Sequence, residues 1–134
     1  MLRGILVAAL TAACAAGGTT TATGSVSCPP QLTIVQPRPG ATVEAPFPVR
    51  YRIRCFRVGR GYGHIHAWLD PERRSVRIEL RPTRLEGTLQ FPDGPMNSGR
   101  RTVLFELARA DHSRVRAPTA RVIVPLVIEG SRTP

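Results

Sequence analysis

The sequence predicts an all-β protein with an immunoglobulin-like antiparallel β-sandwich of about seven strands. Three observations support this fold class. Short runs of β-type residues recur between residues 31 and 129, and proline or glycine separates them. Several runs alternate between apolar and polar residues, and no segment shows a helical period with caps. A small Greek-key barrel is the alternative architecture.

The expected strands cover residues 31–36, 49–55, 64–70, 75–80, 85–91, 101–109 and 117–129. The second run alternates most strictly, because Val49, Tyr51, Ile53 and Cys55 face one way and Arg50, Arg52 and Arg54 the other. A period of two with one apolar face predicts a half-buried strand of an antiparallel sheet.

The later strands follow the same reasoning. In the fourth run we expect Val76, Ile78 and Leu80 to point inward, and in the sixth Val103, Phe105 and Leu107. The fifth run is weak. Pro125 interrupts the last run, which predicts a bulge or an edge position because proline has no N–H to donate.

The N-terminal residues indicate export. Residues 1–13 combine a basic start with a short apolar run, as in a secretory signal peptide, and the run is too short to span a bilayer. Residues 10–14 resemble a bacterial lipobox, which implies that Cys14 carries a lipid; an ordinary signal peptide is the alternative. Residues 14–27 then form a flexible linker, 28–130 one folded domain and 131–134 a tail.

Two cysteines remain if Cys14 is lipidated. Export places Cys28 and Cys55 where disulfides persist. The midpoint between them falls in the turn at residues 37–40, so an antiparallel hairpin folded there would bring the two cysteines together. We therefore predict a Cys28–Cys55 disulfide, with two free buried thiols as the alternative.

All three histidines fall in two short motifs. His64 and His66 lie on one face of the third expected strand, and His112 lies in the turn after the sixth. The two segments lie at the same end of an immunoglobulin-type sandwich, so the imidazoles could converge and bind copper or zinc. Asp111 could add an oxygen ligand or orient a histidine, and Met96 could supply a thioether.

Structural roles are the alternative for these residues. His64, His66 and Trp68 would then simply face away from the core, and Asp111 would form an Asx turn. Trp68 and Tyr62 could also form a carbohydrate-binding surface. The sequence contains no nucleophile elbow, zinc-protease motif or phosphate-binding loop, so we expect no enzyme activity and no resident cofactor beyond a possible metal ion.

The histidine motifs also carry a resemblance. The Gly-His-x-His strand at residues 63–70 and the strand ending in Asp-His at residues 105–112 resemble small exported bacterial immunoglobulin-like domains of unknown function. The resemblance covers residues 31–129 and implies fold and export without an established activity. Periplasmic copper carriers of immunoglobulin-like fold are a looser comparison, and this chain lacks their histidine- and methionine-rich N-terminal stretch.

The charge is strongly basic. The 134 residues carry a formal charge of +10, and all 19 basic residues are arginines. We expect a binding or structural module that is a monomer and is anchored to the membrane through Cys14. We expect no nucleic-acid partner, because the protein is exported. The exposed Arg50, Arg52 and Arg54 favour an anionic cell-wall polymer or an envelope protein as partner; a solvated sheet face is the alternative.

Overall fold

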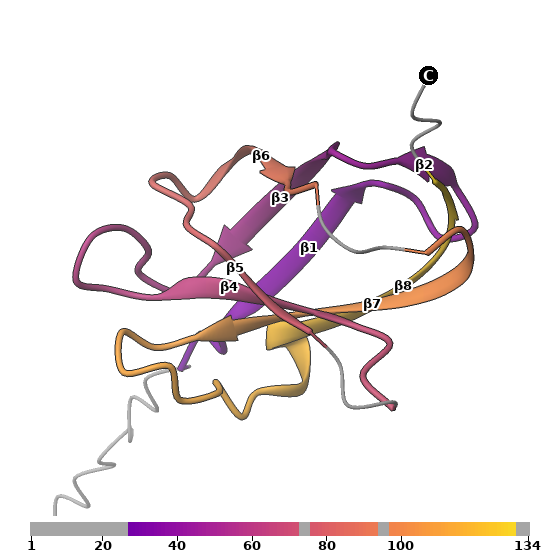
Figure 1. The fold of residues 1–134 in the computed structure, drawn as a ribbon. Helices are drawn as coiled ribbons and strands as arrows, with labels where there is room; N and C mark the ends of the chain where they lie inside the picture. Colours follow the sequence, from indigo (N-terminus) through magenta and orange to yellow (C-terminus); the bar gives the residue numbers. More distant parts are fainter. Residues whose placement is uncertain (1–26, 73–75, 94–96, 131–134) are drawn as a thin grey trace, which may run out of the picture.

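The computed structural model describes residues 27–72, 76–93 and 97–130, and every structural statement below concerns these residues. They form an all-β sandwich of the immunoglobulin-like type (Figure 1). The strands are β1 (Gln31–Gln36), β2 (Thr42–Glu44), β3 (Phe47–Arg54), β4 (His64–Leu69), β5 (Arg77–Leu80), β6 (Glu86–Phe91), β7 (Gly99–Ala108) and β8 (Arg121–Glu129), with the short 3-10 helix η1 (Pro118–Ala120) before β8. None of the helical structure in this part of the chain is long and apolar enough to cross a membrane.

The strands divide between two sheets. One sheet has three strands in the order β1-β3-β6, and the other has five in the order β2-β8-β7-β4-β5. All seven expected runs correspond to strands of these sheets. β2 was not predicted from the sequence. It has only three residues and pairs with β8 in parallel, so the sandwich is not entirely antiparallel. So short a strand carries too little alternation to be recognised.

The path from β1 to β3 differs from the simple hairpin that the sequence predicts. After the turn at residues 37–40 the chain first joins the other sheet as β2, and only then returns as β3. β1 and β3 nevertheless pair antiparallel, with Gln31 opposite Arg54. This register brings the Cα atoms of Cys28 and Cys55 to 5.8 Å, and the predicted disulfide is present.

The core lies between the two sheets and uses alternate residues of each strand. Val49 and Ile53 face Ile65, Phe105 and their neighbours, and all are nearly inaccessible to solvent. Phe47 and Phe91 stack with ring centroids 4.6 Å apart. The apolar face of β3 and the inward face of β7 were therefore predicted correctly.

Two expected inward positions are wrong. Val76 is 55% exposed, because β5 begins only at Arg77 and the alternation does not extend back to it. Cys55 is also exposed, because β3 ends at Arg54 and Cys55 has a φ of 55°. The disulfide thus lies at the surface end of the β1–β3 pair.

Pro125 lies in neither of the expected positions, because the β7–β8 register continues through it without a shift and β8 lies between β2 and β7. It pairs with Thr102 of β7, but its carbonyl accepts a hydrogen bond of 2.7 Å from the Gly40 N–H on the other side. The N and C=O of one strand residue point to the same side in an antiparallel ladder. The proline nitrogen therefore faces away from β7, and no ladder bond with β7 is lost.

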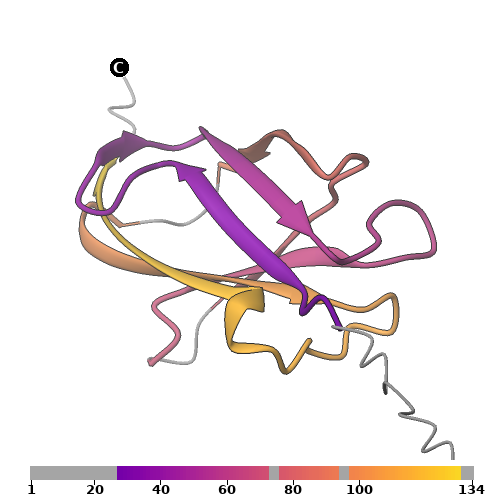
Figure 2. The same cartoon turned by 180° about the vertical axis from the view of Figure 1, so that it is seen from behind.

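Two loops meet at one end of the sandwich. The segment between β3 and β4 and the segment after β7 project from the same end in both views (Figures 1 and 2). His64 at the start of β4 pairs with Ala108 at the end of β7, which fixes this arrangement. The expectation that the two histidine motifs share one end is confirmed.

Candidate metal centre

β4 places two histidines on the outer face of the five-stranded sheet. Ile65 and Ala67 point into the core and are fully buried, so His64 and His66 point away from it. Both histidines are nevertheless largely buried, with exposed fractions of 6% and 2%. A strand position that faces away from the core is normally solvated, so something must cover this part of the sheet.

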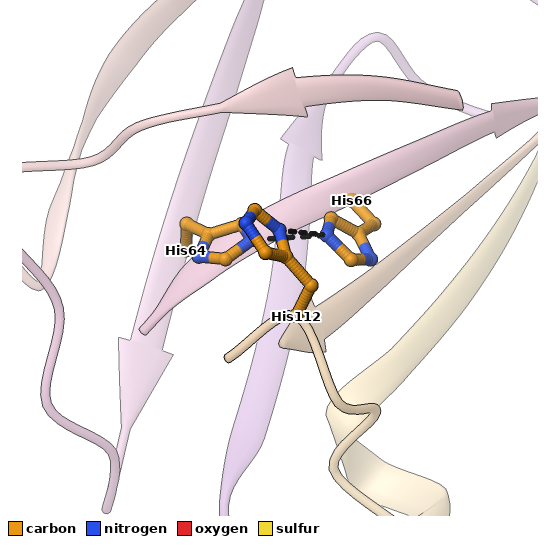
Figure 3. Close-up of side chains that lie close together, drawn as sticks. All are labelled: His64, His66 and His112. Atoms are coloured by element: carbon orange, nitrogen blue, oxygen red, sulfur yellow. Dashed lines mark hydrogen bonds between the residues drawn. The ribbon is translucent and has the colours of Figure 1, made fainter. Parts of the chain in front are cut away.

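The cover comes in part from the turn that follows β7. His112 in this turn stacks on His66 with ring centroids 5.7 Å apart and packs edge-on to His64 at 4.8 Å (Figure 3). His112 itself stays exposed. The cluster thus consists of two buried imidazoles from one strand and one accessible imidazole from a turn.

The local structure of the turn explains where His112 points. The Asp111 carboxylate accepts a hydrogen bond of 2.9 Å from the Ser113 N–H, and the His112 N–H donates to the Arg109 carbonyl at 2.9 Å. His112 has a φ of 65°, a left-handed conformation that is uncommon outside glycine. Asp111 therefore forms the Asx turn that the sequence analysis gave as an alternative, and it does not lie among the clustered ligand atoms.

Gly63 allows the two segments to approach. A Cβ atom at this position would overlap the Phe56 ring and lie 2.9 Å from the Ala108 carbonyl oxygen. Only glycine fits this space without movement of its neighbours. The glycine of the Gly-His-x-His motif is thus needed to seat the start of β4 against the end of β7.

The three imidazoles converge on one point. His64 Nε2 lies 2.9 Å from His66 Nε2, which lies 3.4 Å from His112 Nδ1. Figure 3 shows how the three rings lie together. One nitrogen from each ring lies within 4.8 Å of the others. Ligand nitrogens of a tetrahedral zinc ion, at about 2.05 Å from the metal, are separated by roughly 3.3 Å. The cluster therefore needs only a small adjustment to coordinate a metal ion.

Burial keeps the two inner histidines neutral. Desolvation, with a contribution from nearby His64, lowers the pKa of His66 to about 4. Desolvation also lowers the pKa of His64, although the Glu79 carboxylate opposes this shift. Neutral imidazole is the form that binds metal ions, so both rings are ready to coordinate at neutral pH.

Two carboxylates flank His66 in the sheet. Glu79 of β5 and Glu106 of β7 are its cross-strand partners, so all three lie on the same face. Glu79 Oε1 lies 3.7 Å from His64 Nε2 and forms an ion pair with Arg81 Nε at 3.1 Å. Neither carboxylate was predicted from the sequence, because only the strand register reveals that they adjoin the histidines.

Glu106 is itself buried. It has an exposed fraction of 6% and accepts a hydrogen bond of 2.8 Å from the Trp68 indole N–H. The Trp68 ring lies edge-on to His66 at 6.2 Å. Burying a divalent cation is costly unless negative charge lies nearby, and this pair of glutamates can supply it.

A hollow opens beside the cluster. It has a volume of about 350 Å³ and lies between the glycine-rich segment before β4, the segment after β5 and the turn after β7. Its lining comprises Gly59, Arg60, Gly61, Tyr62, Gly63, His64, Glu79, Arg81, Pro82, Thr83, Ala110 and His112. Two of the three histidines therefore border an accessible space.

The remaining candidates lie elsewhere or play other roles. Trp68 is partly buried against Glu106 and His66, whereas Tyr62 is 46% exposed and packs under the Arg57 guanidinium at 3.9 Å. Only Tyr62 of the two aromatics lines the hollow. Cys14 and Met96 lie outside the described residues.

The arginine stripe lies on the other sheet. Arg50, Arg52 and Arg54 are exposed on the outer face of β3, as predicted, and Arg52 forms an ion pair with Glu86 at 3.2 Å. The strand rise spaces their Cα atoms by about 6.7 Å along one line. This basic face belongs to the three-stranded sheet, whereas the histidine cluster belongs to the five-stranded one.

Comparison with known proteins supports the fold and identifies no family. No family model and no curated protein matches the chain. The chain is similar to an engineered protein solved by the Northeast Structural Genomics Consortium, with a TM-score of 0.52 and 20% identity over 77% of this chain. The chain spans only 21% of the length of that protein, and the likeness shows the fold alone.

A second similarity is weaker. The chain is similar to the CARDB domain of a Pyrococcus furiosus protein, solved in complex with di-metal ions. The TM-score is 0.37 at 10% identity, over 75% of this chain and 86% of that chain. This likeness is too low to support any statement about the site.

Proposed function

We propose that this chain is a non-catalytic binding module of the bacterial cell envelope and that its ligand is a transition-metal ion, copper or zinc, bound by His64, His66 and His112. The observation that carries the proposal is the convergence of one nitrogen from each ring within 4.8 Å. The low pKa of His66 and the flanking carboxylates support it further. The signal-like N-terminus and the lipobox resemblance at Cys14 support anchoring in the envelope.

Copper should bind more tightly than zinc. A site of three imidazole nitrogens follows the general order in which Cu(II) exceeds Zn(II). The chain has one tryptophan, and its ring lies 6.2 Å from His66, so a bound Cu(II) ion should quench its fluorescence. Zn(II) should displace copper only at a large excess.

Titration calorimetry of the purified protein with Cu(II) and with Zn(II) tests the proposal. We expect one ion per chain, and we expect His112→Ala to weaken binding at least about tenfold, as is common when a metal ligand or its support is lost. His112 is exposed, so this variant should fold normally. Arg54→Ala on the other sheet is the control and should bind copper like the wild type. Equal heats for wild type and His112→Ala would leave the cluster a purely structural hydrogen-bond network.

The basic face favours a second candidate function. Arg50, Arg52 and Arg54 form an exposed line of charge that suits a phosphate-bearing cell-wall polymer. Binding of a linear polyphosphate, measured by fluorescence anisotropy at several salt concentrations, tests it. We expect weaker binding at high salt and after replacement of all three arginines by glutamine. Polyphosphate binding that the triple variant retains in full would assign the interaction to other arginines.

A further inference from the structure

The hollow beside the histidine cluster suggests what the metal ion would do once bound, and this inference rests on the proposed function. Structural zinc sites are closed by four protein ligands, whereas sites that bind exogenous molecules keep one position open. This cluster offers three histidine nitrogens, and no other histidine, cysteine or carboxylate of the described residues belongs to it. A four-coordinate ion would therefore retain one position for a ligand from outside.

The open position faces the hollow. His66 is buried and does not line the hollow, whereas His64 and His112 both border it. An ion held by all three rings is thus approached from the side of the hollow. With about 350 Å³, the hollow has room for a small molecule beside the ion.

The charged residues that line the hollow favour an anionic ligand. Arg60 and Arg81 line the hollow with a single carboxylate, that of Glu79. Glu79 is already engaged by Arg81 at 3.1 Å. Two guanidinium groups and a divalent ion therefore outweigh one carboxylate, and the hollow attracts anions.

We propose that the metal ion bound by His64, His66 and His112 takes a small carboxylate from solution as its fourth ligand, in the hollow between residues 59–63 and Arg81. The carboxylate oxygen displaces a bound water and coordinates the ion, while the arginines lie around the hollow. The rival arrangement has Glu79 as the fourth ligand, since its Oε1 lies only 3.7 Å from His64 Nε2. In that case no position would be open.

Anion binding to the copper-loaded protein distinguishes the two arrangements. Azide is the probe, because it forms a charge-transfer absorption with Cu(II), and formate is the competitor. We expect a saturable azide absorption that formate suppresses. Arg60→Ala should weaken azide binding about threefold through the loss of one nearby charge, and Arg54→Ala, which removes the same charge from the other sheet, should not.

Two outcomes overturn this inference without affecting the proposed function. A copper-loaded protein that gives no azide absorption has a closed site, and if Glu79→Gln then gains the absorption, Glu79 is the fourth ligand. Equal azide affinities for wild type and Arg60→Ala would mean that the hollow does not hold the anion. Failure of the protein to bind copper would already appear in the calorimetry and would instead reject the proposed function.

Discussion

The outer faces of the two sheets begin from the same sequence pattern and end in opposite environments. On β3 the outward residues include three arginines, all exposed, and their neighbours in the sheet leave them in solvent. On β4 the outward residues His64 and His66 are buried, with exposed fractions of only 6% and 2%. Both strands alternate with a period of two, so alternation alone does not determine whether an outer face meets water.

The two outer faces differ in whether another segment of the chain covers them. The turn after β7 places His112 over the five-stranded sheet, whereas the arginines of β3 have cross-strand neighbours such as Thr88 and Glu86. Burial changes the chemistry of the covered groups, because it lowers the pKa of His66 to about 4. A polar cluster on a covered sheet face can therefore hold neutral ligands at neutral pH, which a solvated face does not favour.

The largest expected effect concerns the disulfide that braces the arginine-bearing sheet. Cys28 and Cys55 are 27 residues apart, and closing a loop of this length stabilises the fold by roughly 3.5 kcal/mol on the chain-entropy model. The double variant Cys28→Ser, Cys55→Ser should lose about this much free energy of unfolding in urea. Wild-type protein unfolded with dithiothreitol present should match the variant. A loss below about 1 kcal/mol would mean that the sheet needs no covalent brace.

The second prediction concerns acid and belongs to the covered face. The unfolded chain binds a proton at His66 near pH 6.5, whereas the folded protein does so only near pH 4. The unfolded state therefore holds more protons between these values, and stability falls as the pH drops from about 6.5 to about 4. The loss in the metal-free protein should reach up to about 3 kcal/mol.

Urea unfolding of wild type and His66→Gln at a series of pH values checks this. His64 acts in the same direction, since burial also lowers its pKa, whereas the lowered pKa of Glu79 affects stability only below about pH 4.5. We expect a shallower acid dependence in His66→Gln. Parallel curves for the two proteins would show that the histidine is not desolvated in solution.

The sequence predicts the sheets better than it predicts the site. Alternation identifies β3 and β7 because one face of each fills the core, and the Cys28–Cys55 pairing follows from the antiparallel arrangement. The meeting of the histidine motifs follows from loop positions in the expected fold. Glu79 and Glu106 were missed because their place beside His66 depends on strand register, which no local pattern records. The burial of the histidines was missed because it depends on a turn 46 residues away.

The smallest expected effects come from one substitution made on both outer faces. Glu106 accepts a partly buried hydrogen bond of 2.8 Å from Trp68, and Glu86 accepts an exposed one of 3.2 Å from Arg52. Glu106→Ala should cost about 1–3 kcal/mol, because the partly buried indole N–H loses its acceptor. Glu86→Ala should change stability by no more than about 0.5 kcal/mol, because water replaces the lost partner.

Urea unfolding at pH 7.5, where the inner histidines are neutral, separates these two effects from the acid dependence. Glu106→Gln supplies the matched rescue, since its amide oxygen can still accept from Trp68, and it should recover most of the loss. If Glu106→Gln is as unstable as Glu106→Ala, the carboxylate charge rather than the hydrogen bond stabilises this face. If Glu106→Ala and Glu86→Ala lose the same free energy of unfolding, the covered face is as open to water as the arginine face. The histidines would then not lie in the water-excluded surroundings that keep them neutral and able to bind a metal ion.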